Sequence, residues 1–223
     1  MHETTFALPR VERVPVDIDR RTRSAPNDWR HGLPVLTGRL LHLRELQPGD
    51  ATELLPLLSA PEVTRFMSPP PPSVERLVAF VETTHRERRA GRYAGFAIVP
   101  HETGRPVGLV QVRQLEPGFA TAEWGVAIGS AWWGRGLFDE AGRLLLSFAF
   151  DTLGVHRLEA RVAAQNGRAM AAVAKLGGVQ EGLLRRALLT PDGNRVDQVL
   201  WAWLADEWRA RMTRQEEEEL WVH

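Results

Sequence analysis

The chain has 223 residues, of which 43% are hydrophobic and 25% charged, proportions typical of one globular domain with some additional segments. Its 28 Lys and Arg residues balance 28 Asp and Glu residues, and this zero net charge argues against a dedicated nucleic-acid or anionic-membrane surface. The absence of cysteine excludes disulfides, thiolate catalysis and cysteine metal sites, and no apolar run approaches the ~20 residues that a membrane span needs.

The two ends of the chain differ in composition from the part between them. Residues 1–36 carry scattered prolines and charges without a sustained period, which predicts an extended or partly disordered arm that lies on the domain or on a neighbouring subunit. This arm leaves homodimerisation open. It has no apolar stretch like that of a secretory signal, so we expect a soluble, cytoplasmic protein. Residues 37–209 form the predicted domain, and the acidic tail over 210–223 is predicted to be a charged helix end or a solvated segment.

The first elements of the domain are predicted from hydrophobic periodicity. Alternating apolar residues indicate a strand over 39–46, and an apolar stripe behind Asp50, the predicted N-cap, indicates a helix over 50–59. The proline run at 69–72 must be extended, because proline cannot continue a helix. A second helix is predicted over 73–90.

The rest of the domain alternates between strands and helices. Three strands separated by turn-rich stretches are followed by a helix with an apolar stripe, and then by a strand–helix–strand crossover and a last strand. This order predicts an α/β fold with a mixed, mostly antiparallel central sheet flanked by helices. In chain order the predicted strands cover 93–99, 106–115, 120–128, 158–163, 179–189 and 196–205, and the predicted helices cover 134–151 and 167–176.

The segment from Ala122 to Ala141, AEWGVAIGSAWWGRGLFDEA, indicates a binding site. In this segment a predicted strand passes through a glycine-containing loop into the N-terminus of a helix. Glycines let a backbone approach a ligand closely, and the free amides of a helix N-terminus favour phosphate, to which Arg135 adds a positive charge. The alternative is a turn in which glycine only relieves strain. The spacing matches neither the dinucleotide fingerprint nor the Walker motif.

Several spaced motifs occur in order along the chain. AEWGVAI at 122–128 is followed by WGRGLFDEA at 133–141, LEARV at 158–162 and KLG at 175–177, and the series ends in VDQVLWAWLADEW at 196–208. Together they resemble the GNAT superfamily of N-acetyltransferases, and most of all the branch that includes the ribosomal-protein N-terminal acetyltransferases. The resemblance implies the GNAT fold and acetyl-CoA as the cosubstrate, with no metal.

The resemblance also implies roles for individual residues. Backbone amides of the loop would hold the pyrophosphate of acetyl-CoA, and the end of the preceding strand would pair with the pantetheine arm as an additional strand does. Phe138 departs from the family pattern, which has Gly or Ala at its place, and Asn166 is either a contact of the cofactor arm or a helix N-cap. The implied cofactor-binding residues are Val126, Ala127, Ile128, Trp133, Gly134, Arg135, Gly136, Leu137, Phe138 and Asn166.

An amine must be neutral to attack a thioester, so the reaction needs a base. Glu123, on a central predicted strand, is the candidate, acting directly or through water; the alternative is a structural ion pair with an arginine. Many members of the superfamily have a tyrosine in the helix before Lys-Leu-Gly as proton donor, but this chain has Ala-Ala-Val-Ala at 171–174, and its single tyrosine, Tyr93, is distant in the sequence. The thiolate therefore leaves without a dedicated acid, or a serine or histidine donates the proton.

Two functions follow from these features. The first is an enzyme that moves an acetyl group from acetyl-CoA to a primary amine, on a protein N-terminus or a small molecule, by direct attack in a ternary complex. The alternative is a catalytically silent module that binds CoA or an acyl-CoA as a sensor or scaffold. Neither nucleic acid nor a membrane is an expected partner, and no histidine spacing indicates a metal.

Overall fold

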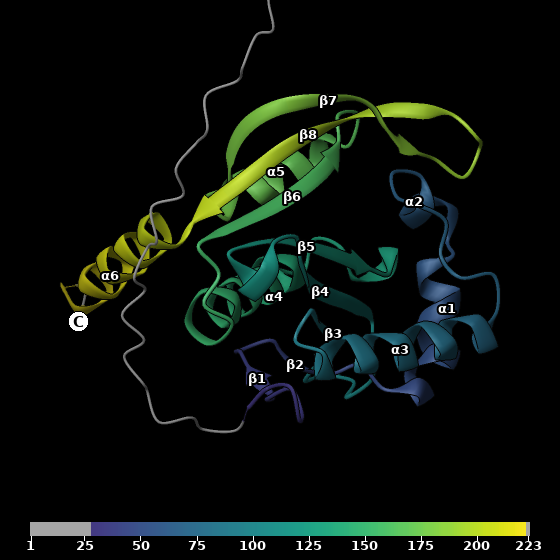
Figure 1. The fold of residues 1–223 in the computed structure, drawn as a ribbon, viewed down its shortest axis with the longest axis horizontal. Coiled ribbons are helices and arrows are strands. Elements are labelled where there is room, and N and C mark those ends of the chain that lie inside the picture. Colours follow the sequence, from purple (N-terminus) through teal and green to yellow (C-terminus); the bar gives the residue numbers. More distant parts are fainter. Residues whose placement is uncertain (1–27, 222–223) are drawn as a thin grey trace, which may run out of the picture.

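The computed structural model describes residues 28–221. Its helices and strands, in chain order, are β1 (Leu36–Thr37), β2 (Leu41–Glu45), α1 (Ala51–Leu58), α2 (Pro61–Thr64), α3 (Val74–Arg89), β3 (Tyr93–Pro100), β4 (Gly108–Gln114), β5 (Thr121–Ile128), α4 (Leu137–Ser147), β6 (Arg157–Ala163), α5 (Gly167–Lys175), β7 (Val179–Leu189), β8 (Arg195–Leu204) and α6 (Ala205–Trp221). The strands form one sheet in the order β1-β2-β3-β4-β5-β6-β8-β7 (Figure 1). Neighbouring strands are antiparallel except β5 and β6, which are parallel. The predicted α/β fold with a mixed, mostly antiparallel sheet is confirmed.

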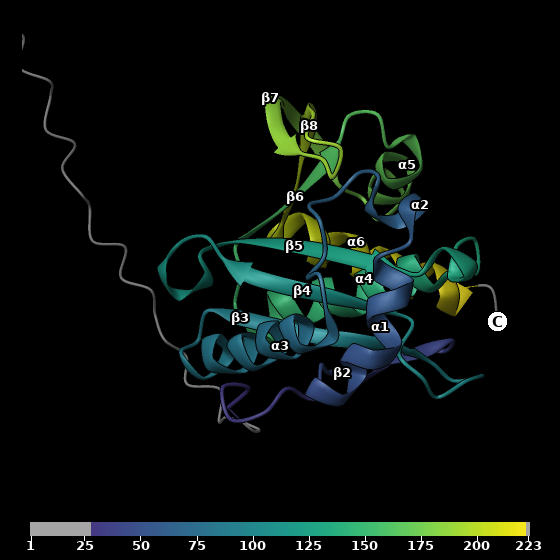
Figure 2. The same cartoon turned by 90° about the vertical axis from the view of Figure 1, so that its right-hand side faces the viewer.

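Helices cover both faces of the sheet (Figure 2). Helices α1 and α3 pack on one face of β2–β5 through an apolar cluster that includes Leu54, Leu77 and Val81. Helices α4 and α5 pack on the other face, where the larger core contains Leu145 and Val173. The apolar stripe of the helix that follows the glycine loop is therefore the surface that this helix buries against the sheet.

This helix begins later than its periodicity predicts. α4 starts at Leu137, because Gly134 and Gly136 have φ angles of 76° and 81°, in the left-handed region that interrupts helical geometry. At its other end the helix continues as a π turn over Phe148–Thr152. The loop before α4 therefore contains more non-helical backbone than the sequence indicated.

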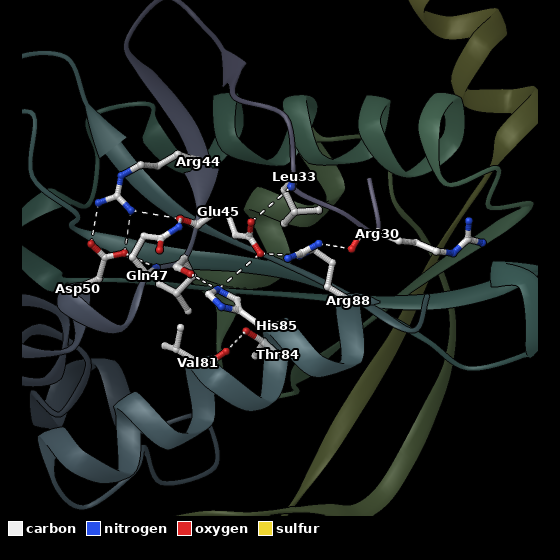
Figure 3. A network of polar contacts seen from close by, with 11 residues as sticks. Arg30, Leu33, Arg44, Glu45, Gln47, Asp50, Val81, Thr84, His85 and Arg88 are labelled. Carbon is white, nitrogen blue, oxygen red and sulfur yellow. Dashed lines mark hydrogen bonds and ion pairs between the residues drawn. The ribbon is translucent and has the colours of Figure 1, made fainter. Parts of the chain in front are cut away.

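The N-termini of α3 and α1 differ in their capping. Ser73 Oγ accepts a hydrogen bond from the amide of Arg76 at 3.3 Å, as a cap does. Asp50 precedes α1, but its carboxylate makes no capping bond to that helix. It accepts instead from the Gln47 amide at 2.8 Å and from the Arg44 guanidinium at 2.6 and 2.8 Å (Figure 3). The prediction that Asp50 caps this helix is wrong, because a bidentate arginine is the stronger partner.

The described end of the predicted arm is attached to the domain. Residues 1–27 lie outside the described part of the chain. Trp29 is buried in the larger core. Arg88, whose Nε lies 2.6 Å from Oε1 of Glu45, donates a hydrogen bond to the carbonyl of Arg30 (Figure 3). A largely buried ion pair thus holds the backbone that precedes β1.

Helix α6 crosses the predicted boundary between domain and tail. It runs from Ala205 to Trp221, and the Trp208 ring lies 6.1 Å from the ring of Phe150 in the core. The division of the chain into arm, domain and tail stays a prediction. None of the described helices combines the length and the apolar character that crossing a bilayer requires.

Candidate active site

Strands β5 and β6 are paired only at their first residues. The parallel register joins Thr121–Glu123 to Arg157–Glu159, after which the two strands separate (Figure 1). β5 remains paired with β4 as far as Ile128, whereas β6 follows β8. Beyond Glu123, the β6-facing edge of β5 therefore has no partner strand among the described residues.

This unpaired edge presents the backbone groups of Val126. In an antiparallel pair, successive residues point their N–H and C=O groups in alternate directions. Gly129 donates its N–H towards the β4 side at 2.9 Å, so Ala127 also faces β4, whereas Val126 and Ile128 face the unpaired edge. The carbonyl of Ile128 accepts the indole N–H of Trp133 at 2.8 Å. Of the three predicted strand residues, Val126 keeps both backbone groups available for an extended ligand.

The loop before α4 carries a row of free amides. Within the described chain, the amides from Gly134 to Asp139 donate to no carbonyl outside the helix, and the first bond of the helix joins Glu140 N to Gly136 O at 3.1 Å. Gly134 lies open, since a Cβ built on it would meet no atom within 4 Å. Free amides at the N-terminus of a helix attract anions through hydrogen bonds and through the helix dipole.

Two arginines flank this loop. Arg135 lies 4.7 Å over the ring of Trp132 and pairs with Glu102 at 3.1 Å. Arg168, in the first turn of α5, lies 4.6 Å over the ring of Trp133. In contrast to Arg135, Arg168 forms no ion pair with any carboxylate of the described residues. The ring of Trp133 therefore holds the guanidinium of Arg168 beside the loop, and the N–H groups of this guanidinium stay free for an anion.

The first turn of α4 attaches the loop to the core. Leu137 is buried, and the ring of Phe138 lies 6.0 Å from that of Trp124, which lies 5.6 Å from Trp203. The side chain at 138 thus packs on the aromatic core, while the backbone amide of the same residue faces the loop. This packing is a physical reason for the departure of Phe138 from the family pattern.

Glu140, in the first turn of α4, bonds to the turn between β1 and β2. Sequence reasoning missed this role of Glu140. Its carboxylate accepts hydrogen bonds from the amides of Arg39, Leu40 and Leu41 at 2.8, 2.7 and 3.0 Å. The β1–β2 turn is thereby held against α4, with Leu40 next to Gly136. A glutamate in the first turn of a helix is ordinarily explained by the helix dipole, so no sequence signal distinguished it.

Asn166 caps α5. Its Oδ1 accepts a hydrogen bond from the amide of Ala169 at 3.1 Å, which is the alternative role that the sequence left open. The Nδ2 group of Asn166 donates to no atom of the described residues. Capping therefore fixes the side chain and leaves one end of its amide for a second contact.

Glu123 lies on the opposite face of β5 from Trp124, and its side chain is 18% exposed. Arg113, its neighbour in register on β4, donates to Oε2 at 2.6 Å, and Nη1 of Arg161 on β6 lies 3.7 Å from the same oxygen. The alternative ion pair is thus present. Within the described chain, Oε1 of Glu123 accepts no hydrogen bond, so the carboxylate can still receive a donor.

Two other carboxylates on this side of the sheet, those of Glu159 and Glu181, are held in ion pairs. Arg157 donates to Glu159 at 2.9 Å and to the two carboxylate oxygens of Glu181 at 3.0 and 2.5 Å. The hydrogen bond from Arg157 lowers the pKa of Glu181 below its ordinary value. No three metal-ligating side chains of the described residues are grouped so that they could hold a metal ion.

The single tyrosine lies on the same face as Glu123. The register places Tyr93 opposite Arg113, and Arg113 opposite Glu123. The Tyr93 hydroxyl donates to Oε1 of Gln111, and burial raises the pKa of Tyr93 above its ordinary value. Sequence reasoning missed Tyr93 and Gln111, because only the pairing of β3, β4 and β5 brings them near Glu123.

Comparisons with known proteins identify a family model and several relatives that this chain resembles. Residues 40–179 match the family model described as acetyltransferase (GNAT) domain. The uncharacterized N-acetyltransferase p20 of Bacillus licheniformis is 30% identical over 149 residues, which are 65% of this chain and 82% of that protein. The structure of Mycobacterium smegmatis RimJ in complex with CoA-disulfide has a TM-score of 0.69 and 26% identity, over 78% of this chain and 85% of RimJ. The ribosomal-protein-S5-alanine acetyltransferase of Vibrio fischeri has the same fold, with a TM-score of 0.71 at 17% identity over 78% of this chain and 98% of that one.

Proposed function

This chain belongs to the GNAT family of acetyltransferases, and from that membership we propose that it moves an acetyl group from acetyl-CoA to a primary amine by direct attack in a ternary complex. One observation carries the proposal. The unpaired edge of β5 leads directly into the loop of free amides before α4. An extended arm that ends in a diphosphate needs these two features in this order.

The backbone of the chain would hold most of acetyl-CoA. Val126 would pair with the pantetheine arm, and the amides from Gly134 to Phe138 would bind the diphosphate. Arg168 would add a positive charge beside the loop, and the free amide end of Asn166 would contact the arm. RimJ, which was solved with CoA in disulfide form, supports the choice of cosubstrate.

Glu123 would act as the base. The thioester supplies an electrophilic carbon; the amine nitrogen forms a C–N bond with it, the C–S bond breaks, and sulfur leaves as the thiolate of CoA. The proton of the amine passes to Oε1 of Glu123, directly or through one water. Arg113 and Arg161 orient the carboxylate through its other oxygen. The thiolate leaves without a dedicated acid and takes a proton from solvent.

Two measurements test the proposed function. Calorimetric titration with acetyl-CoA is expected to show binding well below millimolar concentration. Release of the CoA thiol is then followed over a panel of peptides with free N-termini, small amines and amino-acid derivatives, and at least one acceptor is expected to cause release. Absence of binding at millimolar acetyl-CoA overturns the proposal. Binding without release for any acceptor favours the silent CoA-binding module instead.

Replacing Arg168 by glutamine is expected to weaken CoA binding by about three- to tenfold, because an exposed guanidinium–phosphate contact contributes about 1 kcal/mol. Calorimetry with CoA and with 3′-dephospho-CoA measures the effect and identifies the phosphate. A loss confined to CoA indicates the 3′-phosphate, whereas an equal loss with both ligands indicates the diphosphate.

Arg195→Gln is the matched control for this change. Arg195 is an exposed arginine at the start of β8, and it too forms no ion pair with a described carboxylate. The control removes the same charge from the protein outside the loop and outside α5. Equal affinities of the Arg168 variant and the wild type for both ligands would show that Arg168 only packs on Trp133.

A further inference from the structure

The face of the sheet that carries Glu123 has a second polar group, which the proposed reaction does not use. The register places Gly95 of β3 opposite Gln111 of β4, and Gln111 opposite Gly125 of β5. These residues share a face with Glu123, because residues two apart in a strand point to the same side. Gln111 is only half-buried, so this part of the face stays accessible beside α3.

Tyr93 orients the side chain of Gln111. A Cβ built on Gly95 would lie 2.9 Å from Cε1 of Tyr93, so only glycine lets this ring lie across β3. In that position the Tyr93 hydroxyl donates to Oε1 of Gln111. Because the amide oxygen is engaged, the NH₂ end of the same amide is directed away from Tyr93.

This NH₂ group lies over Gly125. A Cβ built on Gly125 would lie 3.6 Å from Nε2 of Gln111, so a larger side chain there would fill the space into which the amide points. In the described chain, Nε2 donates no hydrogen bond. Gly125 lies between Glu123 and Val126, in the part of β5 that β6 has left. A free donor therefore lies over Gly125, on the β4 side of the strand that carries the proposed base.

We propose that Gln111 binds the carbonyl oxygen next to the acceptor amine, so that the site takes α-amino carbonyl compounds such as a peptide N-terminus in preference to simple amines. The amine itself faces Glu123. Gln111 and Glu123 are diagonal neighbours on one face of the sheet, and the backbones of such neighbours lie about 7–8 Å apart, within reach of long side chains. The acceptor amine can therefore donate to Glu123 while its adjacent carbonyl oxygen accepts from Gln111. This inference rests on the proposed function.

The discrimination has a physical cause. A site built to hydrogen-bond a substrate group rejects an analogue that lacks the group, since its own polar atom is then left unpaired. Tyr93 is a positioning residue in this scheme. Without its hydroxyl the Gln111 amide rotates freely, and its donor faces the acceptor for only part of the time.

The test compares Gln111→Leu and Tyr93→Phe with the wild type on two probes, trialanine amide and isopropylamine. For each protein, kcat/KM for trialanine amide is divided by kcat/KM for isopropylamine. Because the same two amines are used throughout, their intrinsic reactivity cancels when the ratio of a variant is compared with that of the wild type. Gln111→Leu is expected to lower kcat/KM for trialanine amide about five- to tenfold, which is the value of one neutral hydrogen bond. The kcat/KM for isopropylamine is expected to stay within about twofold of the wild-type value. Tyr93→Phe is expected to change the ratio in the same direction by less.

A second readout does not depend on turnover. Calorimetry with the CoA-bound protein is expected to show tighter binding of trialanine amide than of isopropylamine, and Gln111→Leu is expected to remove most of that difference. Gln114→Leu is the control, because this glutamine lies on the same strand but points to the other face.

Two outcomes overturn the inference. Equal losses on both probes would mean that Gln111 and Tyr93 support the fold, and no loss on either would mean that the amide does not meet the acceptor. If the wild type binds acetyl-CoA but shows no preference for trialanine amide, this inference fails while the proposed function stands. If it binds no acetyl-CoA, both fail.

Discussion

Glu123→Gln is expected to lower kcat/KM for amine acetylation about 100-fold or more while the affinity for acetyl-CoA stays within about twofold. Glutamine keeps a carbonyl oxygen that can accept the hydrogen bond from Arg113, so the side chain retains its place. It has no carboxylate to take the proton of the amine. Steady-state kinetics on the best acceptor, with calorimetry of acetyl-CoA binding, measures both quantities.

Glu159→Gln is the matched control for this change. Glu159 lies directly across from Glu123 in the register and is also paired with an arginine, Arg157. The turnover of the Glu159→Gln variant is expected to stay within a few-fold of the wild type. The midpoints of thermal unfolding of Glu159→Gln and Glu123→Gln should be similar. If Glu123→Gln retains wild-type turnover, Glu123 serves only in the ion pair with Arg113, and the base must be sought elsewhere.

Gly134→Ala is expected to weaken acetyl-CoA binding by about ten- to a hundredfold, the value of one amide hydrogen bond to a charged phosphate. Gly134 has a φ of 76°, which an alanine adopts only at a cost of about 1–2 kcal/mol. The loop relieves this strain by changing its backbone conformation, and the change moves its free amides out of the arrangement that would bind the diphosphate. In addition, the new methyl group stands in open space beside them. Calorimetry gives the loss in affinity.

Gly118→Ala separates strain from binding. Gly118 lies in the β4–β5 connection, with a φ of 73° and no atom within 4 Å of a Cβ built on it. The two alanine variants should therefore lose similar free energies of unfolding in urea, while only Gly134→Ala loses affinity. A Gly134→Ala protein that binds acetyl-CoA as tightly as the wild type would show that the loop amides do not hold the diphosphate.

The order of the elements from β2 to β8, apart from the four-residue α2, and the type of sheet were predictable from hydrophobic periodicity and turn residues. The strands over 93–99 and 120–128 were predicted nearly to their ends, because their apolar residues face a buried core. The start of α4 was placed too early, since periodicity continues through a loop that glycines with positive φ keep out of the helix. The role of Asp50 was also misjudged, because an arginine from a neighbouring strand competed for its carboxylate.

The candidate site was predictable only where it is contiguous in the chain. The strand–loop–helix segment with Gly134 and Gly136 is local, so one stretch of sequence carries it. Glu123 was recognised as a carboxylate on a central strand, and both its alternatives, ion pair and base, remain compatible with the geometry. Tyr93 and Gln111 carried no signal, because their relation to Glu123 depends on the register of three strands.

The sequence by itself determined most of the elements, the glycine loop and the family, since these depend on neighbouring residues and on motifs of fixed spacing. Only the tertiary structure decided where β5 leaves β6, which backbone groups of Val126 stay unpaired, and that Glu140 holds a turn 100 residues away. It also decided that the lone tyrosine stands on the face of the proposed base. These features arise from pairing between distant segments, which local periodicity does not specify.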